Sequence, residues 1–282
     1  MQLISTTEAL REQIAEWRAT GDHIALVPTM GNLHAGHISL VELARNHAER
    51  VVVSIFVNPT QFGEGEDYDE YPRTLDRDKR RLKKANADLV FAPDVDTMYP
   101  FGVDEATSVT VPVLNAELCG AFRPGHFDGV TTVVARLISL VQPDITVFGE
   151  KDYQQLLIVR RLVDDLSLPI EILSGPTVRE DDGLAMSSRN QYLSEGDRAI
   201  APKLYETLQD IARELEKGKR NYAQIEKRAV AKLNKAGFET DYVAIRRAGT
   251  LTEPDRDNDE LIVLAAARLG GARLIDNLRV KV

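Results

Sequence analysis

The sequence predicts an α/β fold, a Rossmann-like doubly wound parallel sheet with a smaller C-terminal α+β domain. Three observations lead to this prediction. Strand-like and helix-like segments alternate over roughly the first 175 residues, which is typical of βαβ units. Residues 51–57 form a continuous, mostly β-branched run, typical of a strand covered on both faces. Two charged helical segments and then three strand-like runs close the chain. We therefore expect a Rossmann-like domain at 1–175 and a smaller α+β domain at 176–282.

The elements follow in order from local signals. Ser5 and Glu8 have the spacing of a capping box, and the helix that they begin should stop near Gly21. Apolar runs predict further strands at 23–27, 88–92, 145–148 and 170–173, and helical spacing predicts helices after His37 and at 75–85, 130–141 and 153–166. The second domain should contain helices at 195–217 and 222–236 and strands at 240–245, 261–267 and 272–280. The acidic stretches 64–70 and 253–260 are interpreted as solvated loops.

Composition indicates an ordinary globular enzyme. Of 282 residues, 43% are hydrophobic and 28% are charged, a balance that a disordered chain does not have. The net charge of −9 argues against general binding to nucleic acid or to an acidic membrane surface. Cys119 is the single cysteine, so an intrachain disulfide and a cysteine-rich metal site are excluded. The N-terminus lacks the features of a secretory signal, and no apolar run reaches the ~18 residues of a membrane span, so we expect a cytoplasmic protein.

The most informative motif joins the strand at 23–27 to the helix after His37. Pro28, Gly31 and Gly36 force a turn there and place His34 and His37 at the start of the helix. Free N–H groups and the positive end of the helix dipole favour phosphate at such a position, and imidazoles add hydrogen-bond donors. The motif resembles the nucleotide-binding element of the nucleotidyltransferase superfamily, whose members form adenylates from ATP. The alternative is a pair of loop histidines without a chemical role.

Two further clusters offer groups for a nucleotide. Gly149, Glu150, Lys151 and Asp152 follow the strand at 145–148, where the lysine can pair with phosphate and Asp152 with ribose hydroxyls. The alternative is a helix-start carboxylate beside a solvated lysine. The polar loop at the domain boundary contains Met186, Ser187, Ser188 and Arg189 and resembles the Lys-Met-Ser-Lys-Ser-type loop of adenylate-forming enzymes. Its alternative is a serine-rich helix cap with a surface arginine.

A fourth cluster follows the strand at 51–57. The amides of Asn58 and Gln61 can donate and accept hydrogen bonds, which suits a substrate with hydroxyls and a carboxylate; the alternative is a simple Asn-Pro turn. Carboxylates at 71–78 can help to hold the magnesium that accompanies ATP. Asp128 can cap a helix, and His126 is interpreted as structural or substrate-adjacent rather than catalytic.

Taken together and in this order, the clusters closely resemble the pantothenate synthetase (pantoate–β-alanine ligase) family. The resemblance implies that (R)-pantoate attacks the α-phosphorus of ATP to give pantoyl adenylate and pyrophosphate, and that β-alanine then displaces AMP. It implies catalytic roles for His37 (the family's proton donor), His34, Lys151 and Arg189. It implies pantoate contacts for Gln61 and Gln155, with Gln61 beside β-alanine, substrate contact for Asn58, and Mg²⁺ at Asp78. The implied ATP-binding residues are Met30, Gly31, Asn32, Leu33, His34, Ala35, Gly36, His37, Gly149, Glu150, Lys151, Asp152, Val178, Met186, Ser187, Ser188 and Arg189. A homodimer joined through the N-terminal domain is implied as well.

Two other functions remain open at this point. A nucleotidyltransferase that hands AMP or CMP to a phosphorylated acceptor shares the His-x-Gly-His element. The amide-bearing loop at Asn58 and Gln61, without a basic cluster, favours a carboxylate substrate over a phosphorylated one. A non-catalytic nucleotide-binding regulator should have lost His37, Lys151 or Arg189, and all three are present.

Overall fold

The computed structural model describes residues 1–255 and 260–282, so part of the acidic stretch 253–260 lies outside the described residues. The described residues form two compact units. The first comprises Met1–Glu150 and Ile158–Pro176, and the second comprises Lys151–Leu157 and Thr177–Val282. Each unit has its own sheet and its own hydrophobic core.

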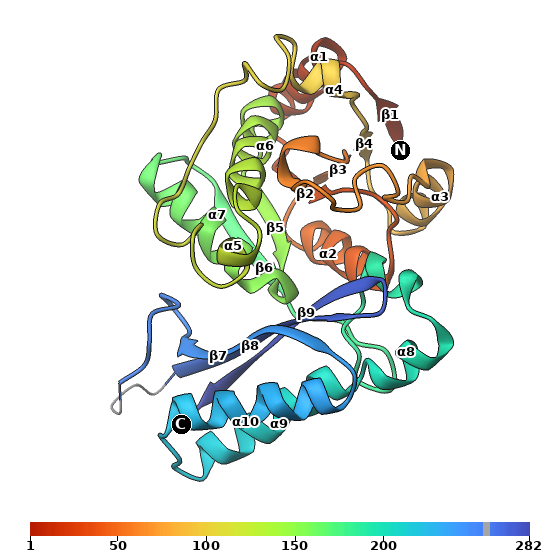
Figure 1. Ribbon diagram of the computed structural model, residues 1–282. Coiled ribbons are helices and arrows are strands. Elements are labelled where there is room, and N and C mark those ends of the chain that lie inside the picture. Colours follow the sequence, from red (N-terminus) through yellow and green to blue (C-terminus); the bar gives the residue numbers. More distant parts are fainter. Residues whose placement is uncertain (256–259) are drawn as a thin grey trace. The chain divides into compact units, whose positions relative to one another are not determined.

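The first unit is built on a six-stranded sheet in the order β1-β4-β3-β2-β5-β6, with every neighbouring pair parallel (Figure 1). The strands are β1 (Gln2–Ile4), β2 (Ile24–Thr29), β3 (Arg50–Ile55), β4 (Leu89–Phe91), β5 (Ile145–Gly149) and β6 (Glu171–Gly175). The doubly wound parallel sheet is therefore confirmed. The edge strand β1 was not predicted, because three residues without a buried run give no periodic signal.

The sheet changes its winding direction between β2 and β5, which are paired neighbours. From β2 the chain moves to β3 and β4 on one side, whereas β5 and β6 extend the other side. Ligands of open α/β sheets bind outside the carboxyl ends of the strands at such a switch point. The loops that follow β2 and β5 therefore flank the expected binding position, and the turn after β3 lies next to them.

Helices cover both faces of this sheet, because right-handed crossovers lead away from β2 in opposite directions. Helix α2 packs against β2, β3 and β5, and α6 packs against β2 and α1 (Figure 1). The helices of this unit are α1 (Thr7–Ala19), α2 (Ala35–Arg45), α3 (Leu75–Lys84), α4 (Val95–Met98), α5 (Cys119–Phe122), α6 (His126–Val141) and α7 (Tyr153–Asp165), whose first turn groups with the second unit. Single-turn 3₁₀ segments are η1 (Pro59–Gln61) and η2 (Glu150–Asp152).

Two predicted helix caps are wrong. The N-cap of α1 is Thr6, whose hydroxyl accepts the N–H of Ala9 at 3.3 Å, and not Ser5. Helix α6 begins at His126, four residues before the predicted start at 130, after a left-handed Gly125 with φ 79°. Asp128 therefore lies inside the first turn, where it accepts a hydrogen bond from Asn115 at 2.9 Å instead of capping the helix.

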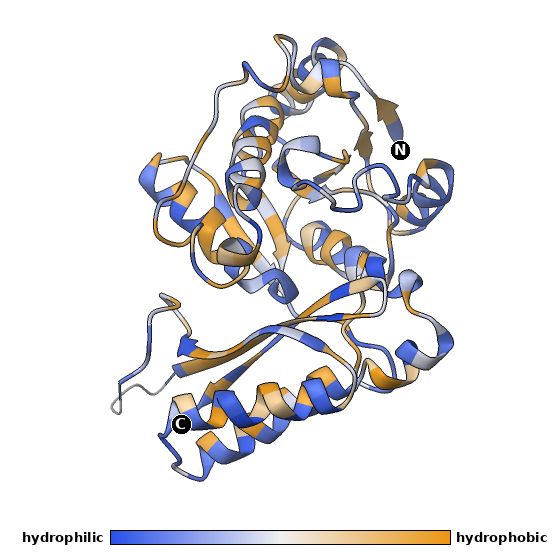
Figure 2. Cartoon of the chain, in the orientation of Figure 1, coloured by the Kyte–Doolittle hydropathy of each residue, from blue (hydrophilic) through white to orange (hydrophobic). Residues whose placement is uncertain are grey.

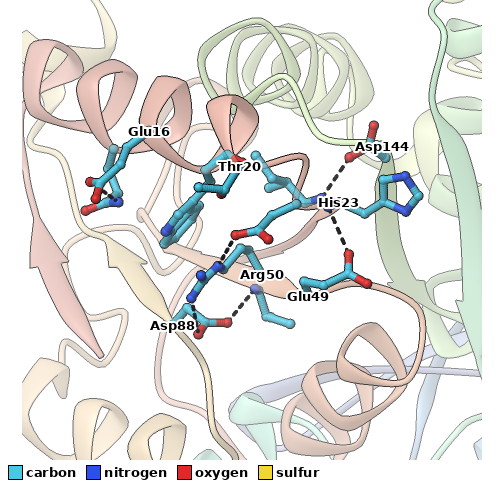
Figure 3. A network of polar contacts seen from close by, with 12 residues as sticks. Glu16, Thr20, His23, Glu49, Arg50, Asp88 and Asp144 are labelled. Carbon is cyan, nitrogen blue, oxygen red and sulfur yellow. Dashed lines mark hydrogen bonds and ion pairs between the residues drawn. The ribbon is translucent and has the colours of Figure 1, made fainter.

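Charged residues also gather at the amino-terminal edge of the sheet, on the far side of the strands from the predicted site (Figure 3). Glu49 accepts a hydrogen bond from the N–H of His23 at 2.9 Å, and Asp144 accepts one from the N–H of Ile24 at 2.7 Å. Arg18 adds an ion pair to Asp144 at 2.7 Å. These carboxylates satisfy backbone donors where strands begin, so this network is structural.

The second unit packs helices against a three-stranded antiparallel sheet in the order β7-β8-β9. Its elements are η3 (Ser188–Tyr192), α8 (Glu195–Ile200), α9 (Lys203–Glu216), α10 (Tyr222–Lys235), β7 (Glu239–Arg247), β8 (Glu260–Leu269) and β9 (Ala272–Lys281). Figure 2 shows apolar and polar residues alternating along α9 and α10, as expected of helices that cover a sheet on one face. The single helix predicted at 195–217 is divided at Pro202, because proline has no N–H to continue the helix. Among the described residues, no helix has the length and hydropathy needed to cross a membrane.

Candidate active site

The loop after β2 has an unusual backbone. Gly31 (φ 82°) and Asn32 (φ 49°) are consecutive left-handed residues. A Cβ on Gly31 would lie 3.1 Å from the Ile55 side chain and 3.3 Å from Asp78 Oδ2, so both the backbone angle and the space favour glycine. The loop then leads directly into α2, whose N-cap is His34.

The two histidines cap α2 reciprocally. His34 Nδ1 accepts the N–H of Gly36 at 3.2 Å, and His37 Nδ1 accepts the N–H of His34 at 3.3 Å. The ring centroids are 4.0 Å apart, and both side chains are half-buried. The sequence thus places both imidazoles at a helix N-terminus, as predicted, and the helix start itself orients them.

This arrangement selects one form of each imidazole. A ring nitrogen that accepts a backbone N–H carries no proton, so in the neutral ring the proton lies on Nε2. His34 and His37 are both held in this Nε2–H tautomer by the contacts of their Nδ1 atoms. The start of α2 therefore provides two oriented imidazole N–H donors, which suits an oxygen that gains negative charge.

Asp78 holds this loop from α3. Its carboxylate accepts the N–H groups of Asn32 and Leu33, both at 2.9 Å, and the hydroxyl of Thr74 at 3.0 Å. The residue is completely buried. Both oxygens are therefore engaged, and the described residues contain no group of three or more His, Cys, Asp or Glu side chains that could hold a metal ion. Asp78 is therefore a loop-positioning residue, and its role as a magnesium ligand stays a prediction.

We expect Asp78→Ala to destabilise the protein and to weaken ATP binding. The substitution leaves the buried N–H groups of Asn32 and Leu33 without their acceptor, at a cost of about 1–3 kcal/mol each. Urea unfolding and the KM for ATP measure the two effects. Asp76→Ala is the matched control, because Asp76 lies in the same helical turn with 85% of its side chain exposed. Equal unfolding midpoints for the two variants would contradict the role of Asp78.

The turn after β3 contains the predicted amides. Asn58 is buried, and its Nδ2 donates to Gln61 Oε1 at 3.2 Å and to the carbonyl of Gly129 at 3.1 Å. Its Oδ1 accepts from the hydroxyl of Tyr99 at 2.7 Å. Since protein groups contact both ends of this amide, Asn58 positions Gln61, and its contact with substrate stays a prediction.

Gln61 itself is half-buried and contacts the loop after β2. Its Nε2 donates to Met30 Sδ at 3.2 Å. The structure therefore brings together Met30, which was predicted to bind ATP, and Gln61, which was predicted to bind the carboxylate substrate. The close approach of α6 to this turn requires Gly129, where a Cβ would lie 2.3 Å from the carbonyl oxygen of Thr60.

In the second unit, strand β9 holds two of the predicted phosphate-binding segments. Asn277 Nδ2 donates to the carbonyl of Lys151 at 2.9 Å. The adjacent Asp276 accepts two hydrogen bonds from Arg179, at 2.6 and 2.9 Å. Arg179 in turn stacks on the Tyr205 ring at 3.5 Å. Burial raises the pKa of Asp276, and the contacts with Arg179 oppose this effect.

The loop that contains the predicted serines and arginine is folded onto itself. The N–H of Met186 donates to the carbonyl of Val178 at 3.0 Å, which places these two predicted ATP-binding residues side by side. Ser187 caps η3 by accepting the N–H of Arg189 at 3.2 Å. The serine cap, which was the alternative interpretation of this loop, is therefore present. It orients the segment that contains Arg189.

Sequence reasoning missed several supporting residues. Glu66 was interpreted as part of a solvated loop, but its carboxylate is 18% exposed and pairs with Arg123 at 2.6 Å. Asp276 and Asn277 form a polar pair between apolar neighbours, Leu274 and Ile275 before them and Leu278 after them, and this pattern could have indicated a buried polar contact. Glu150, predicted to contact ATP, accepts a hydrogen bond from Ser174 at 3.2 Å.

A doubly wound sheet with paired imidazoles at a helix start beside its switch point defines a nucleotide-binding α/β protein. The model of the pantoate–β-alanine ligase family matches residues 2–279. The chain belongs to this family, whose members are also named pantothenate synthetases.

Individual relatives cover the chain from end to end. The pantothenate synthetase of Ectopseudomonas mendocina is 54% identical over 281 residues, which are 100% of this chain and 99% of the relative. The crystal structure of pantothenate synthetase from Thermus thermophilus is similar with a TM-score of 0.91 and 49% identity, covering 99% of both chains. The pantoate–β-alanine ligase of Francisella tularensis, complexed with "Beta-gamma ATP" and β-alanine, has a TM-score of 0.83 and 33% identity, covering 99% of this chain and 97% of that one.

Proposed function

We propose that this chain condenses (R)-pantoate with β-alanine to form pantothenate, at the expense of ATP, which leaves as AMP and pyrophosphate. Membership of the pantoate–β-alanine ligase family over residues 2–279 supports this reaction. The observation that carries the proposal is the reciprocal capping of α2 by His34 and His37, which fixes two Nε2–H donors at a helix N-terminus. Such donors stabilise an oxygen that gains charge, which is what adenylation requires.

The first half-reaction forms pantoyl adenylate. A carboxylate oxygen of pantoate attacks the α-phosphorus of ATP, and the bond from this phosphorus to the bridging oxygen of pyrophosphate breaks. Negative charge then grows on the leaving pyrophosphate, so the reaction needs oriented cations and N–H donors rather than a nucleophilic side chain. We assign the Nε2–H groups of His34 and His37, the ammonium of Lys151 and the guanidinium of Arg189 to this task, with His37 as the proton donor.

The second half-reaction forms the amide. The free amine of β-alanine attacks the activated carbonyl carbon, the bond to the AMP oxygen breaks, and the amine loses a proton. This step depends mainly on holding amine and anhydride in line. We assign the amides of Gln61 and Gln155 to the hydroxyls and carboxylate of pantoate, with Gln61 also beside β-alanine. Asp152 is assigned to ribose and Val178 to adenine.

The magnesium that accompanies ATP is proposed to be held by phosphate oxygens and water, as Mg²⁺ commonly is, with Asp78 as the candidate protein ligand.

We also propose a cytoplasmic homodimer. The side chains of Phe101, Val113 and Phe122, all in the first unit, are 83%, 74% and 51% exposed, which suits burial by a second copy. Sedimentation velocity tests the dimer, and a monomer at micromolar concentration would contradict it.

Pantoate-dependent exchange of pyrophosphate into ATP, in the absence of β-alanine, tests the proposed function. We expect exchange with pantoate and none without it, because the first half-reaction is reversible and needs only the acid and ATP. A nucleotidyltransferase that uses a phosphorylated acceptor would show no exchange with pantoate, and neither would a non-catalytic nucleotide-binding protein. Absence of exchange would overturn the proposal.

We expect Gln155→Ala to impair the use of pantoate more than the use of ATP. The nearby Tyr153 anchors this turn, donating to the carbonyl of Ala248 at 2.8 Å, so the substitution removes the amide and leaves the backbone in place. Loss of one hydrogen bond to a charged substrate should raise the KM for pantoate about tenfold. Steady-state titrations measure both substrates, with Arg161→Ala, exposed on the same helix, as control. Equal rises for ATP and pantoate would contradict the assignment.

A further inference from the structure

A second set of contacts fixes Gln61 through its backbone. The carbonyl oxygen of Gln61 lies 2.7 Å from His126 Nδ1 and 3.3 Å from Arg123 Nη2. The side chains of Arg123 and His126 also contact each other, with Nη1 and Nε2 2.9 Å apart. Glu66 completes the set, because its two carboxylate oxygens each accept from Arg123 at 2.6 Å.

The chemistry of these partners determines where the proton of His126 lies. A carbonyl oxygen accepts only, so Nδ1 of His126 donates to Gln61; a guanidinium donates only, so Nε2 accepts from Arg123. The proton on Nδ1 of His126 is the one that donates to Gln61, whereas in His34 and His37 the Nδ1 atoms accept. The two partners of His126 thus determine that His126 donates to the carbonyl oxygen of Gln61.

Glu66 is held in its charged form. Burial raises the pKa of Glu66, but the hydrogen bonds and the charge of Arg123 outweigh burial and lower the pKa to about 2 from the ordinary value of 4.5. At neutral pH the charged carboxylate therefore holds the guanidinium of Arg123 in place. Arg123 contacts both Glu66 and His126 and so links the two.

The side-chain amide of Gln61 is held at its other end by groups already described. Its Oε1 accepts from Asn58, and its Nε2 donates to Met30. The backbone of Gln61 is thus restrained by α6 and the turn before it. Its side chain is restrained independently, by the loops after β2 and β3. A shift of the Gln61 carbonyl would turn the amide away from its present orientation.

We propose that His126 and Arg123, with Glu66 holding Arg123, are positioning residues that orient Gln61 toward the carboxylate substrate. The proposal rests on the proposed function, in which Gln61 binds pantoate. It gives a role to the segment Arg123-Pro-Gly-His126, which capping does not explain because Gly125 and not a polar side chain precedes α6. These residues act through Gln61 and do not themselves touch the substrate.

Two substitutions of His126 separate this role from a general structural one. In His126→Asn the side-chain amide can occupy the position of Nδ1 and donate to Gln61, whereas in His126→Gln it reaches the position of Nε2 and loses that contact. We expect His126→Gln, and likewise Arg123→Met, to raise the KM for pantoate about tenfold in the exchange assay, with the KM for ATP unchanged. His126→Asn should keep the KM for pantoate near that of the wild type.

The control is His47→Gln, an exposed histidine in the same unit, and thermal melts of each variant record folding. Equal KM values for pantoate in His126→Asn and His126→Gln would overturn the proposal, as would parallel rises for pantoate and ATP. Absence of exchange in the wild type would instead overturn the proposed function. The two failures are therefore distinguishable.

Discussion

Replacing His37 or Lys151 with alanine is expected to lower the rate of pantoyl adenylate formation by on the order of 10²–10³-fold, the usual effect of losing one group that stabilises developing charge. His37 supplies an Nε2–H donor whose orientation is fixed by the contact of its Nδ1 with the His34 N–H. Lys151 supplies an ammonium, while its backbone carbonyl is held independently by Asn277. Alanine at 151 should therefore remove the charge without releasing the segment.

His37→Asn distinguishes loss of the donor from loss of the helix cap. The Asn side-chain oxygen can accept the N–H of His34 as Nδ1 does, but it has no group at the position of Nε2. We expect this variant to melt like the wild type and to lose as much activity as His37→Ala. Rapid-quench measurement of pyrophosphate formation provides the rates, with His47→Ala as an exposed-histidine control. Near-normal rates in the His37 and Lys151 variants would remove the proposed roles.

Breaking the ion pair between Arg179 and Asp276 is expected to cost about 3–5 kcal/mol of unfolding free energy, because a buried charge is left without its partner. The Asp276 side chain is 2% exposed, and Arg179 makes two hydrogen bonds to it. Either Arg179→Ala or Asp276→Ala should show this loss in urea unfolding. The loop of 178–190 should lose order as well, since Arg179 is its link to β9.

A double-mutant cycle provides the control for this prediction. Replacing both members with apolar residues, as in Arg179→Met with Asp276→Leu, removes both charges and should cost less than either single alanine substitution. Single variants that lose under about 1 kcal/mol would show that the pair contributes little, in the manner of an exposed pair. A double variant that loses the sum of both single effects would contradict the coupling.

Local sequence signals predicted the backbone of the site well. Apolar runs and glycines placed the loops after β2, β3 and β5, and the position of His34 and His37 at a helix start followed from Gly31 and Gly36. These features are local, because a turn and a helix cap are determined by residues a few positions apart. The fold class was predicted correctly because it, too, followed from local sequence signals.

Partners that are distant in the sequence could not be predicted. Asp78 accepts from Asn32 across 46 residues, a contact that no local pattern indicates. Asp276 pairs with Arg179 across 97 residues. In each case, burial determines whether a polar side chain forms hydrogen bonds with solvent, with substrate or with other protein groups. Burial depends on the tertiary fold. The contacts of Asn58 with Gly129 and Tyr99 could not be predicted for this reason.

Isotope transfer tests the central chemistry most directly. Pantoate labelled with ¹⁸O in both carboxylate oxygens should transfer one labelled oxygen to AMP and keep one in the pantothenate amide, because the attacking oxygen remains on phosphorus when the amine displaces AMP. Mass spectrometry of the products from one complete turnover measures both positions. Label in inorganic phosphate with ADP as product, or unlabelled AMP, would contradict an adenylate route.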